Sequence, residues 1–340
     1  MLCGILSLRE QEYFCPNYYI RMGFIMMKIG CVSLDVSHPK ALAGKMEAFC
    51  MDMKFEYLWD KGFRTAAERE AFVTRYGLAG EVDEISEMVD KVDMGFVHSC
   101  NWEKHLEQAM PFIEAGKPVF IDKPLVGSVE DVKKVRELLA KGAVIYGASS
   151  CRYVDDILNF VNMPQEKKGD VVSIYCTVGV DEFNYAIHAV EILSTIAGCK
   201  AVSCQYTGSG KSPDGMVCET YNIHFENGII GTYHVTLGKH QKFHVTVMTT
   251  TNTFYIGVDS AKLLVSLLRE LYRQWRYGKS NLCDVETLLN CTEVMLCGKK
   301  SRDEKNGAVV AIPELEAHDK FDGYAFEKEY AATAMAAAKK

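Results

Sequence analysis

Residues 115–125 read Ala-Gly-Lys-Pro-Val-Phe-Ile-Asp-Lys-Pro-Leu, an apolar run that ends in an acid, a lysine and a proline. The run has the composition of a buried strand, and the helix-like segment before it makes the two together half of a β-α-β unit. Ligands of parallel α/β sheets bind outside the carboxyl ends of the strands, so Lys123 is a candidate for chemistry. The alternative interpretation is a solvated loop lysine before a turn-forming proline.

Strand-like and helix-like segments alternate from residue 28 to about residue 149, which is typical of a parallel sheet covered on both faces. Strands are expected at 28–34, 55–59, 94–98, 119–122 and 144–148, with helices at 39–53, 66–76, 85–89, 103–115 and 129–141.

Further along, β-branched or alternating runs at 171–178, 201–207, 216–225, 229–237, 243–249 and 253–258 indicate an open, mainly antiparallel sheet. Helices are expected beside it at 185–197, 261–277 and 285–297. The predicted fold is therefore a Rossmann-type doubly wound α/β domain at 27–149, followed by an α+β domain at 150–330. Residues 1–26 are expected to be a non-native or disordered extension, and 331–340 a frayed tail.

Composition narrows the class of partner. The chain has 340 residues, 48% of them hydrophobic, and a net charge of −7 without a basic stripe, which argues against nucleic acid. Thirteen cysteines show no metal-ligand spacing, so reduced thiols in the cytoplasm and no metal site are expected. No apolar stretch is long enough for a membrane span. A small-molecule ligand fits this composition best.

Three short motifs point to one family. They are His105-Leu-Glu-Gln-Ala109, Glu114-Ala-Gly-Lys117 and Asp122-Lys-Pro-Leu125. Together they closely resemble the glucose–fructose oxidoreductase/inositol dehydrogenase family, Gfo/Idh/MocA, over roughly residues 27–196. The family signature is Glu-Lys-Pro, and here aspartate replaces the glutamate. The resemblance implies a dinucleotide-binding domain and a second sheet that forms one wall of the substrate site and often the subunit interface.

The expected cofactor turn departs from the usual glycine pattern. Residues 30–39 read Gly-Cys-Val-Ser-Leu-Asp-Val-Ser-His-Pro, with no Gly-x-Gly-x-x-Gly, and Asp35 brings negative charge to the place of the phosphates. Ser37 is a good N-cap and Pro39 suits a first helical turn, so backbone N–H groups can still face an anion. A glycine-poor Leu-Asp-x-Ser-His turn also looks like one branch of the family. The alternative is a degenerate site that has lost its cofactor.

NAD is the expected cofactor, with NADP as the second choice. Asp60 follows the second strand, where an acid binds the adenosine ribose, although an exposed turn acid is the other interpretation. The predicted cofactor-binding residues are Ser33, Leu34, Asp35, Val36, Ser37, Asp60, Ser99, Cys100, Asn101, Asp122 and Lys123.

The resemblance also implies a proton acceptor. The family has Asp-x-x-x-His at the domain junction, and this chain has Asn184-Tyr-Ala-Ile-His188. Positions i, i+4 and i+7 share a helix face, so Asn184, His188 and Glu191 are expected to point together. Asparagine cannot accept a proton, so His188 works without the usual partner, or Asp181 substitutes for it. A lone helical histidine is otherwise more often a core residue.

The predicted catalytic residues are Lys123, His188 and Asn184. Arg152 and Asp181 join these three as predicted substrate ligands, and an ion pair is the alternative for Arg152. Hydride transfer from an alcohol needs a base with a pKa near neutrality and a cation near the oxygen, which His188 and Lys123 supply.

The sequence favours an NAD-dependent oxidoreductase acting on a secondary hydroxyl of a sugar, inositol or related polyol. Two alternatives remain at this point. One is an enzyme that keeps NAD bound and performs redox-neutral elimination, hydrolysis or epimerisation. The other is a non-catalytic sensor of dinucleotide or sugar, which the missing glycines and Asn184 would favour. A homodimer or homotetramer through the antiparallel sheet is expected, because an exposed apolar sheet needs cover.

Overall fold

The computed structural model describes residues 26–338. The extension predicted over residues 1–26 therefore lies, apart from Met26, outside the described residues. At the other end, helix α13 (Gly323–Ala338) continues through most of the predicted tail. Within residues 26–338, no helix has both the length and the apolar character that crossing a membrane requires.

The amino-terminal half forms a six-stranded sheet in the order β3-β2-β1-β4-β5-β6. The strands are β1 (Met27–Val32), β2 (Met53–Trp59), β3 (Gly80–Glu81), β4 (Met94–Val97), β5 (Val119–Ile121) and β6 (Ile145–Tyr146). The pairs β1–β2, β1–β4 and β2–β3 are all parallel. The helices between them are α3 (His38–Ala48), α4 (Ala66–Tyr76), α5 (Ser86–Val89), α6 (His105–Glu114) and α7 (Val129–Ala140), with the 3₁₀ turn η1 (Trp102–Lys104) before α6. This is the strand order of a Rossmann fold, which confirms the predicted doubly wound sheet.

The carboxy-terminal half forms a seven-stranded sheet in the order β12-β11-β7-β10-β9-β8-β13. The strands are β7 (Val171–Val180), β8 (Ala201–Lys211), β9 (Val217–Phe225), β10 (Ile230–Leu237), β11 (His244–Thr249), β12 (Thr253–Gly257) and β13 (Val310–Ala311). The sheet is mainly antiparallel, as predicted, but β7 and β10 pair in parallel. The chain reaches β10 from β7 through α10, β8 and β9, so no tight hairpin joins these neighbours.

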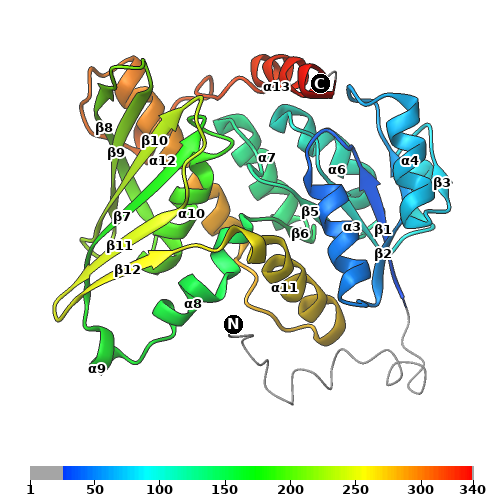
Figure 1. The fold of residues 1–340 in the computed structure, drawn as a ribbon, viewed down its shortest axis with the longest axis horizontal. Coiled ribbons are helices and arrows are strands. Elements are labelled where there is room, and N and C mark those ends of the chain that lie inside the picture. The colour runs from blue at the N-terminus through cyan, green and yellow to red at the C-terminus, as the bar shows by residue number, and fades with distance from the viewer. Residues whose placement is uncertain (1–25, 339–340) are drawn as a thin grey trace. The chain divides into compact units, whose positions relative to one another are not determined.

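One face of this second sheet is covered by α10 (Ala186–Ala197) and α12 (Val285–Asp303), which lie against it in Figure 1. Along β7, Ile174, Cys176 and Val178 are buried and alternate with more exposed residues, as expected for a sheet with one covered face. Smaller helices complete this half of the chain: α8 (Asp155–Val161), α9 (Gln165–Lys168), α11 (Leu263–Tyr277) and the 3₁₀ turns η2 (Ser150–Tyr153), η3 (Ser260–Lys262) and η4 (Ile312–Glu314).

Contacts divide the chain into two compact units. The first unit runs to Ser99 and also takes Gln108–Phe120, and the second unit takes Cys100–Glu107 and the chain from Ile121 onward. The first unit therefore contains the candidate residues of the expected cofactor turn, 33–37, together with Asp60 and Ser99. The other candidate residues, including Lys123 and His188, all belong to the second unit.

Candidate active site

Lys123 lies two residues after the end of β5, where the sequence predicts a functional lysine. Its Nζ donates two hydrogen bonds to Asn184, one to the backbone carbonyl oxygen and one to Oδ1, each at 2.8 Å. Asp122 holds the main chain in place, because its Oδ1 accepts the backbone N–H of Lys123 at 2.8 Å. Nζ also lies 5.2 Å from the ring centre of Tyr185. Burial of the ammonium lowers the pKa of Lys123, and the acids nearby, Asp122 first, only partly oppose that change.

An ammonium has three N–H donors, and Asn184 accepts two of those of Lys123. No third acceptor for Nζ occurs among the described residues. Lys123 can therefore keep both bonds to Asn184 and still donate one hydrogen bond to a bound oxygen. Asn184 itself lies in the turn before α10, so the prediction that it shares a helix face with His188 is wrong.

His188 lies in the first turn of α10, and its imidazole is buried. Nδ1 is 2.6 Å from Oγ of Ser149 and 3.8 Å from Sγ of Cys151. The ring packs edge-on against Tyr185, with centres 5.8 Å apart, and against Phe243 at 5.4 Å. Lys123 and His188 therefore share Tyr185 as a neighbour.

Asp181 begins the turn that carries Asn184. Its Oδ1 accepts the backbone N–H groups of Phe183 and Tyr185, both at 3.0 Å, so the carboxylate shapes the turn. Its Oδ2 is buried and has no hydrogen-bond partner among the described residues. A buried carboxylate oxygen without a donor is costly, and a substrate hydroxyl would satisfy it.

Arg152 and Glu191 form a buried ion pair, with side chains 5% and 4% exposed. Nε of Arg152 donates to Oε2 of Glu191 at 2.7 Å, and the backbone N–H of Ser149 donates to both carboxylate oxygens at 2.9–3.0 Å. Burial opposes the charge of Arg152, but Glu191 raises the pKa of the guanidinium above its usual range. Ser149 thus joins Glu191 to His188 through its backbone N–H and its hydroxyl.

The expected cofactor turn, residues 33–37 in the first unit, is stabilised by two features that do not require glycine. Ser33 adopts a φ of 73°, the left-handed conformation that glycine usually supplies, and its Oγ accepts the backbone N–H of Asp35 at 3.1 Å. Arg64 then donates to the carbonyl oxygens of Leu34 at 2.9 Å and Asp35 at 2.7 Å. Ser37 is the N-cap of α3, as predicted, but its side chain makes no capping hydrogen bond. Arg64 adds positive charge to a turn where Asp35 is negative.

Asp60 follows β2 and is buried. Oδ1 accepts the backbone N–H of Gly62 at 2.8 Å, whereas Oδ2 has no hydrogen-bond partner among the described residues. Burial raises the pKa of Asp60 to about 6, the bond from Gly62 opposes this shift, and the charge of Asp35 adds to it. An unsatisfied, buried carboxylate oxygen at the end of the second strand fits a ribose hydroxyl, so these residues suit an adenosine dinucleotide.

The three residues predicted beside the nicotinamide are engaged in other contacts. Ser99 donates to Oε1 of Gln108 at 2.6 Å, and Cys100 is buried. Asn101 accepts the backbone N–H of Glu103 through Oδ1 and donates to Glu327 through Nδ2, both at 3.0 Å. The side chain of Asn101 is thus committed to capping η1 and to α13. Val36, also predicted for the cofactor, is half-buried.

Sequence reasoning missed two residues of these clusters, Arg64 and Ser149. Both act through contacts with partners that are 29 to 42 residues away in the chain. Neither lies in a motif, and only their positions just after a strand could have drawn attention to them.

The strand order, together with a buried acid at the end of β2, defines a dinucleotide-binding domain of the Rossmann type. Residues 42–150 match the model of an oxidoreductase family described as an NAD-binding Rossmann fold. Residues 42–150 are thus similar to the Gfo/Idh/MocA family, which agrees with the resemblance of the Asp122-Lys-Pro-Leu125 motif, and the matching family model describes an NAD-binding fold.

A curated relative is 1,5-anhydro-D-fructose reductase of Ensifer adhaerens, 33% identical over 87 residues. That match covers 25% of this chain and spans only about a quarter, 26%, of the reductase. Among solved structures, a probable dehydrogenase from Thermotoga maritima matches with a TM-score of 0.73 and 15% identity, covering 85% of this chain and 100% of the other. The scyllo-inositol dehydrogenase from Lactobacillus casei, solved with NAD(H) and scyllo-inositol, matches with a TM-score of 0.72, 15% identity and the same two coverages. At such identities these structures establish the fold.

Proposed function

We propose that this protein is an NAD-dependent oxidoreductase that removes hydride from a secondary hydroxyl carbon of a sugar, inositol or related polyol. The observation that carries the proposal is the desolvated ammonium of Lys123, held by Asn184 with one N–H left to donate. Bound NAD supplies the hydride acceptor, so the protein has to bind the substrate, polarise the oxygen and remove a proton.

Lys123 donates its remaining N–H to the reacting oxygen and stabilises the negative charge that develops there. His188 takes the hydroxyl proton. In the tautomer in which Nδ1 donates to Oγ of Ser149, the lone pair of the imidazole is on Nε2, which is the nitrogen that accepts this proton. Asp181 accepts a second hydroxyl through Oδ2, which favours a substrate with several hydroxyl groups.

At the cofactor end, Asp60 accepts a ribose hydroxyl and so favours NAD over NADP, whose ribose carries a phosphate. The cofactor site is also lined, in this proposal, by Val36, Ser99, Cys100 and Asn101. The relatives support the substrate class, since one is named a reductase of an anhydro sugar and another was solved with an inositol.

The test is a screen of sugars and inositols with purified protein and NAD, following NADH formation, for the wild type and for Lys123→Met. Methionine keeps most of the side-chain volume and removes the ammonium. We expect turnover by the wild type and a loss of at least about 100-fold in kcat for the variant, both measured at saturating NAD. The exposed Lys239→Met is the matched control.

Absence of Lys123-dependent turnover, with NAD still bound, would favour the non-catalytic sensor. Product formation without net NADH would favour redox-neutral chemistry with a retained cofactor.

In the same proposal, the protein forms a homo-oligomer through the outer face of the second sheet. The pairing register puts Tyr175, Ile230, Met248 and Tyr255 on one face, and Tyr255 is 81% exposed. Exposed apolar side chains in one contiguous face are typical of a protein interface. Light scattering should give a dimer or tetramer for the wild type, and Tyr255→Lys combined with Met248→Lys should shift it to the monomer.

A further inference from the structure

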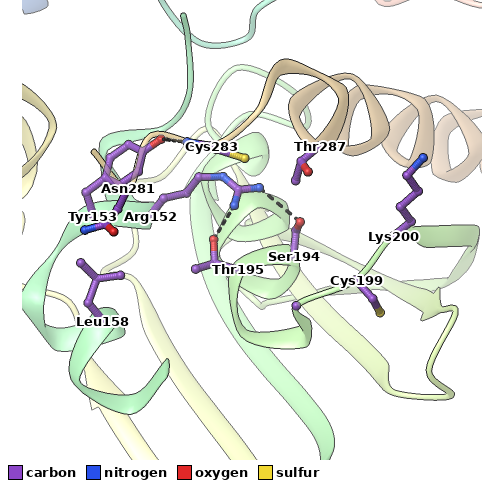
Figure 2. A pocket seen from close by; sticks show the side chains of 11 residues that line it. Arg152, Tyr153, Leu158, Ser194, Thr195, Cys199, Lys200, Asn281, Cys283 and Thr287 are labelled. Atoms are coloured by element: carbon purple, nitrogen blue, oxygen red, sulfur yellow. Dashed lines mark hydrogen bonds between the residues drawn. The ribbon is translucent and has the colours of Figure 1, made fainter. Parts of the chain in front are cut away.

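A pocket of about 310 Å³ lies within the second unit, apart from the cluster around Lys123. It is lined by η2, by the end of α10 and the turn after it, and by the segment that leads into α12. Figure 2 shows the side chain of Arg152 extending among the other lining side chains, with Lys200 at the opposite side. Neither Lys123, Asn184 nor His188 lines this pocket.

The lining is cationic. Arg152 and Lys200 are its charged residues, and no aspartate or glutamate is among the lining residues. The other lining residues with amide or hydroxyl groups are Asn281, Tyr153, Ser194, Thr195 and Thr287. Glu191 balances the charge of Arg152 but does not line the pocket. From outside the lining, Glu270 accepts the backbone N–H of Asn281 at 2.8 Å, so the attraction for a negatively charged group comes from the donors of Arg152 and Lys200 within the pocket and not from a net positive charge around it.

Arg152 also has a donor to spare. Its Nε donates to Glu191, Nη1 to Oγ1 of Thr195 at 2.6 Å, and Nη2 to Oγ of Ser194 at 3.2 Å and Sγ of Cys291 at 3.6 Å. A guanidinium has five N–H groups, so the second N–H of Nη1 has no acceptor among the described residues. A buried, charged donor without an acceptor is costly, and an anionic oxygen in the pocket would satisfy it.

We propose that this pocket binds a small oxyanion, the carboxylate or phosphate group of a metabolite, between Arg152 and Lys200. The guanidinium is fixed in advance by Glu191, Thr195 and Ser194, so binding does not require it to reorganise. Lys200 is exposed at the edge of the pocket and reaches the anion from the solvent side. Asn281 donates from the segment before α12.

The proposal is tested by calorimetric titration of the full chain with inorganic phosphate and, separately, with malonate, each against sodium chloride of matched ionic strength. We expect saturable binding of at least one of the two probes, and the pair shows whether the pocket prefers phosphate or carboxylate. Lys200→Gln should weaken binding about two- to five-fold, as expected for an exposed charge, and Asn281→Leu by a similar factor. Lys211→Gln, an exposed lysine at the end of β8, should leave binding unchanged.

Arg152 is left intact in these variants, because its removal would leave the buried carboxylate of Glu191 without its countercharge. If neither probe shows saturable binding, or if binding is the same in the wild type, Lys200→Gln and Asn281→Leu, the pocket does not bind oxyanions. Because binding is measured without substrate, this outcome is independent of whether Lys123 supports turnover.

Discussion

Nζ of Lys123 lies 2.8 Å from two oxygens of a single residue, the backbone carbonyl oxygen and Oδ1 of Asn184, which is 61 residues away in the chain. The family motif has aspartate at the position of Asn184. With asparagine there, the ammonium is oriented by two neutral acceptors, and burial lowers its pKa. Asn184 thus orients the ammonium of Lys123, but it lacks the negative charge with which an aspartate would stabilise that ammonium.

Asn184→Asp should raise the pKa of Lys123, because a carboxylate 2.8 Å away favours the charged form. The reaction needs the ammonium, so the rate falls as pH rises through this pKa. We expect the basic limb of the pH–rate profile to move to higher pH by about 1 unit. Asn162→Asp, at an exposed helix end, is the control. A basic limb that stays in place would show that Lys123 does not control it.

Ser149→Ala should reduce kcat about ten-fold with little change in KM. The hydroxyl of Ser149 lies 2.6 Å from Nδ1 of His188 and, in our proposal, holds the imidazole in the orientation that presents Nε2 to the substrate. Losing one buried hydrogen bond costs about 1–1.5 kcal/mol, which corresponds to this factor if it acts on the reacting state.

Ser150→Ala is the matched control for this substitution, because Ser150 is the next residue, is also buried and makes no side-chain hydrogen bond among the described residues. Equal kcat values for the two variants would contradict the positioning role of Ser149.

The sequence predicted those elements whose boundaries are set locally. Helix α4 was predicted at 66–76 and found there, because Thr65 and Glu68 form a capping box and Gly77 adopts a left-handed conformation at its end. By contrast, β8 was predicted to end at 207 but continues to Lys211 through Gly208 and Gly210. Pairing with β9 extends it, and composition does not reveal pairing.

The candidate site residues show the same contrast between local signals, which the sequence reveals, and contacts distant in the chain, which it does not. Lys123 and Asn184 were recognisable from motifs and are in contact. The role of Arg64 at the cofactor turn could not be recognised from the sequence. It depends on hydrogen bonds from the Arg64 side chain to carbonyl oxygens 29 and 30 residues earlier in the chain. For Arg152, the sequence left open a substrate contact or an ion pair, and the structure shows the ion pair with Glu191.

Glu191→Gln should destabilise the fold by about 3–5 kcal/mol, because it leaves the guanidinium of Arg152 buried without a countercharge. Chemical denaturation at neutral pH measures this change in the free energy of unfolding. Glu47→Gln breaks an ion pair with Arg75 at the surface and should change stability little. Similar stabilities for the two variants would show that Glu191 is not needed to balance Arg152.

Asp60 should make stability fall as pH rises from about 4 to about 6. Its pKa is raised from 3.8 to about 6 by burial, so in this range the folded protein holds a proton that the unfolded chain has released. Binding more protons in the folded state means that stability decreases with pH, by about 1–3 kcal/mol across the range, and levels off above pH 6. Asp60→Asn should remove this slope, whereas Asp83→Asn, at an exposed carboxylate, should retain it.

The same titration should appear in cofactor binding with the opposite sign. The ionised carboxylate is the better acceptor for a ribose hydroxyl, so NAD affinity in the wild type should increase between pH 5 and pH 7. In Asp60→Asn, affinity should be lower at pH 7 and nearly independent of pH. Calorimetric titration with NAD at pH 5, 6 and 7 measures both effects. An affinity in Asp60→Asn equal to that of the wild type at pH 7 would mean that Asp60 does not contact the cofactor, and the preference for NAD over NADP would then need another source.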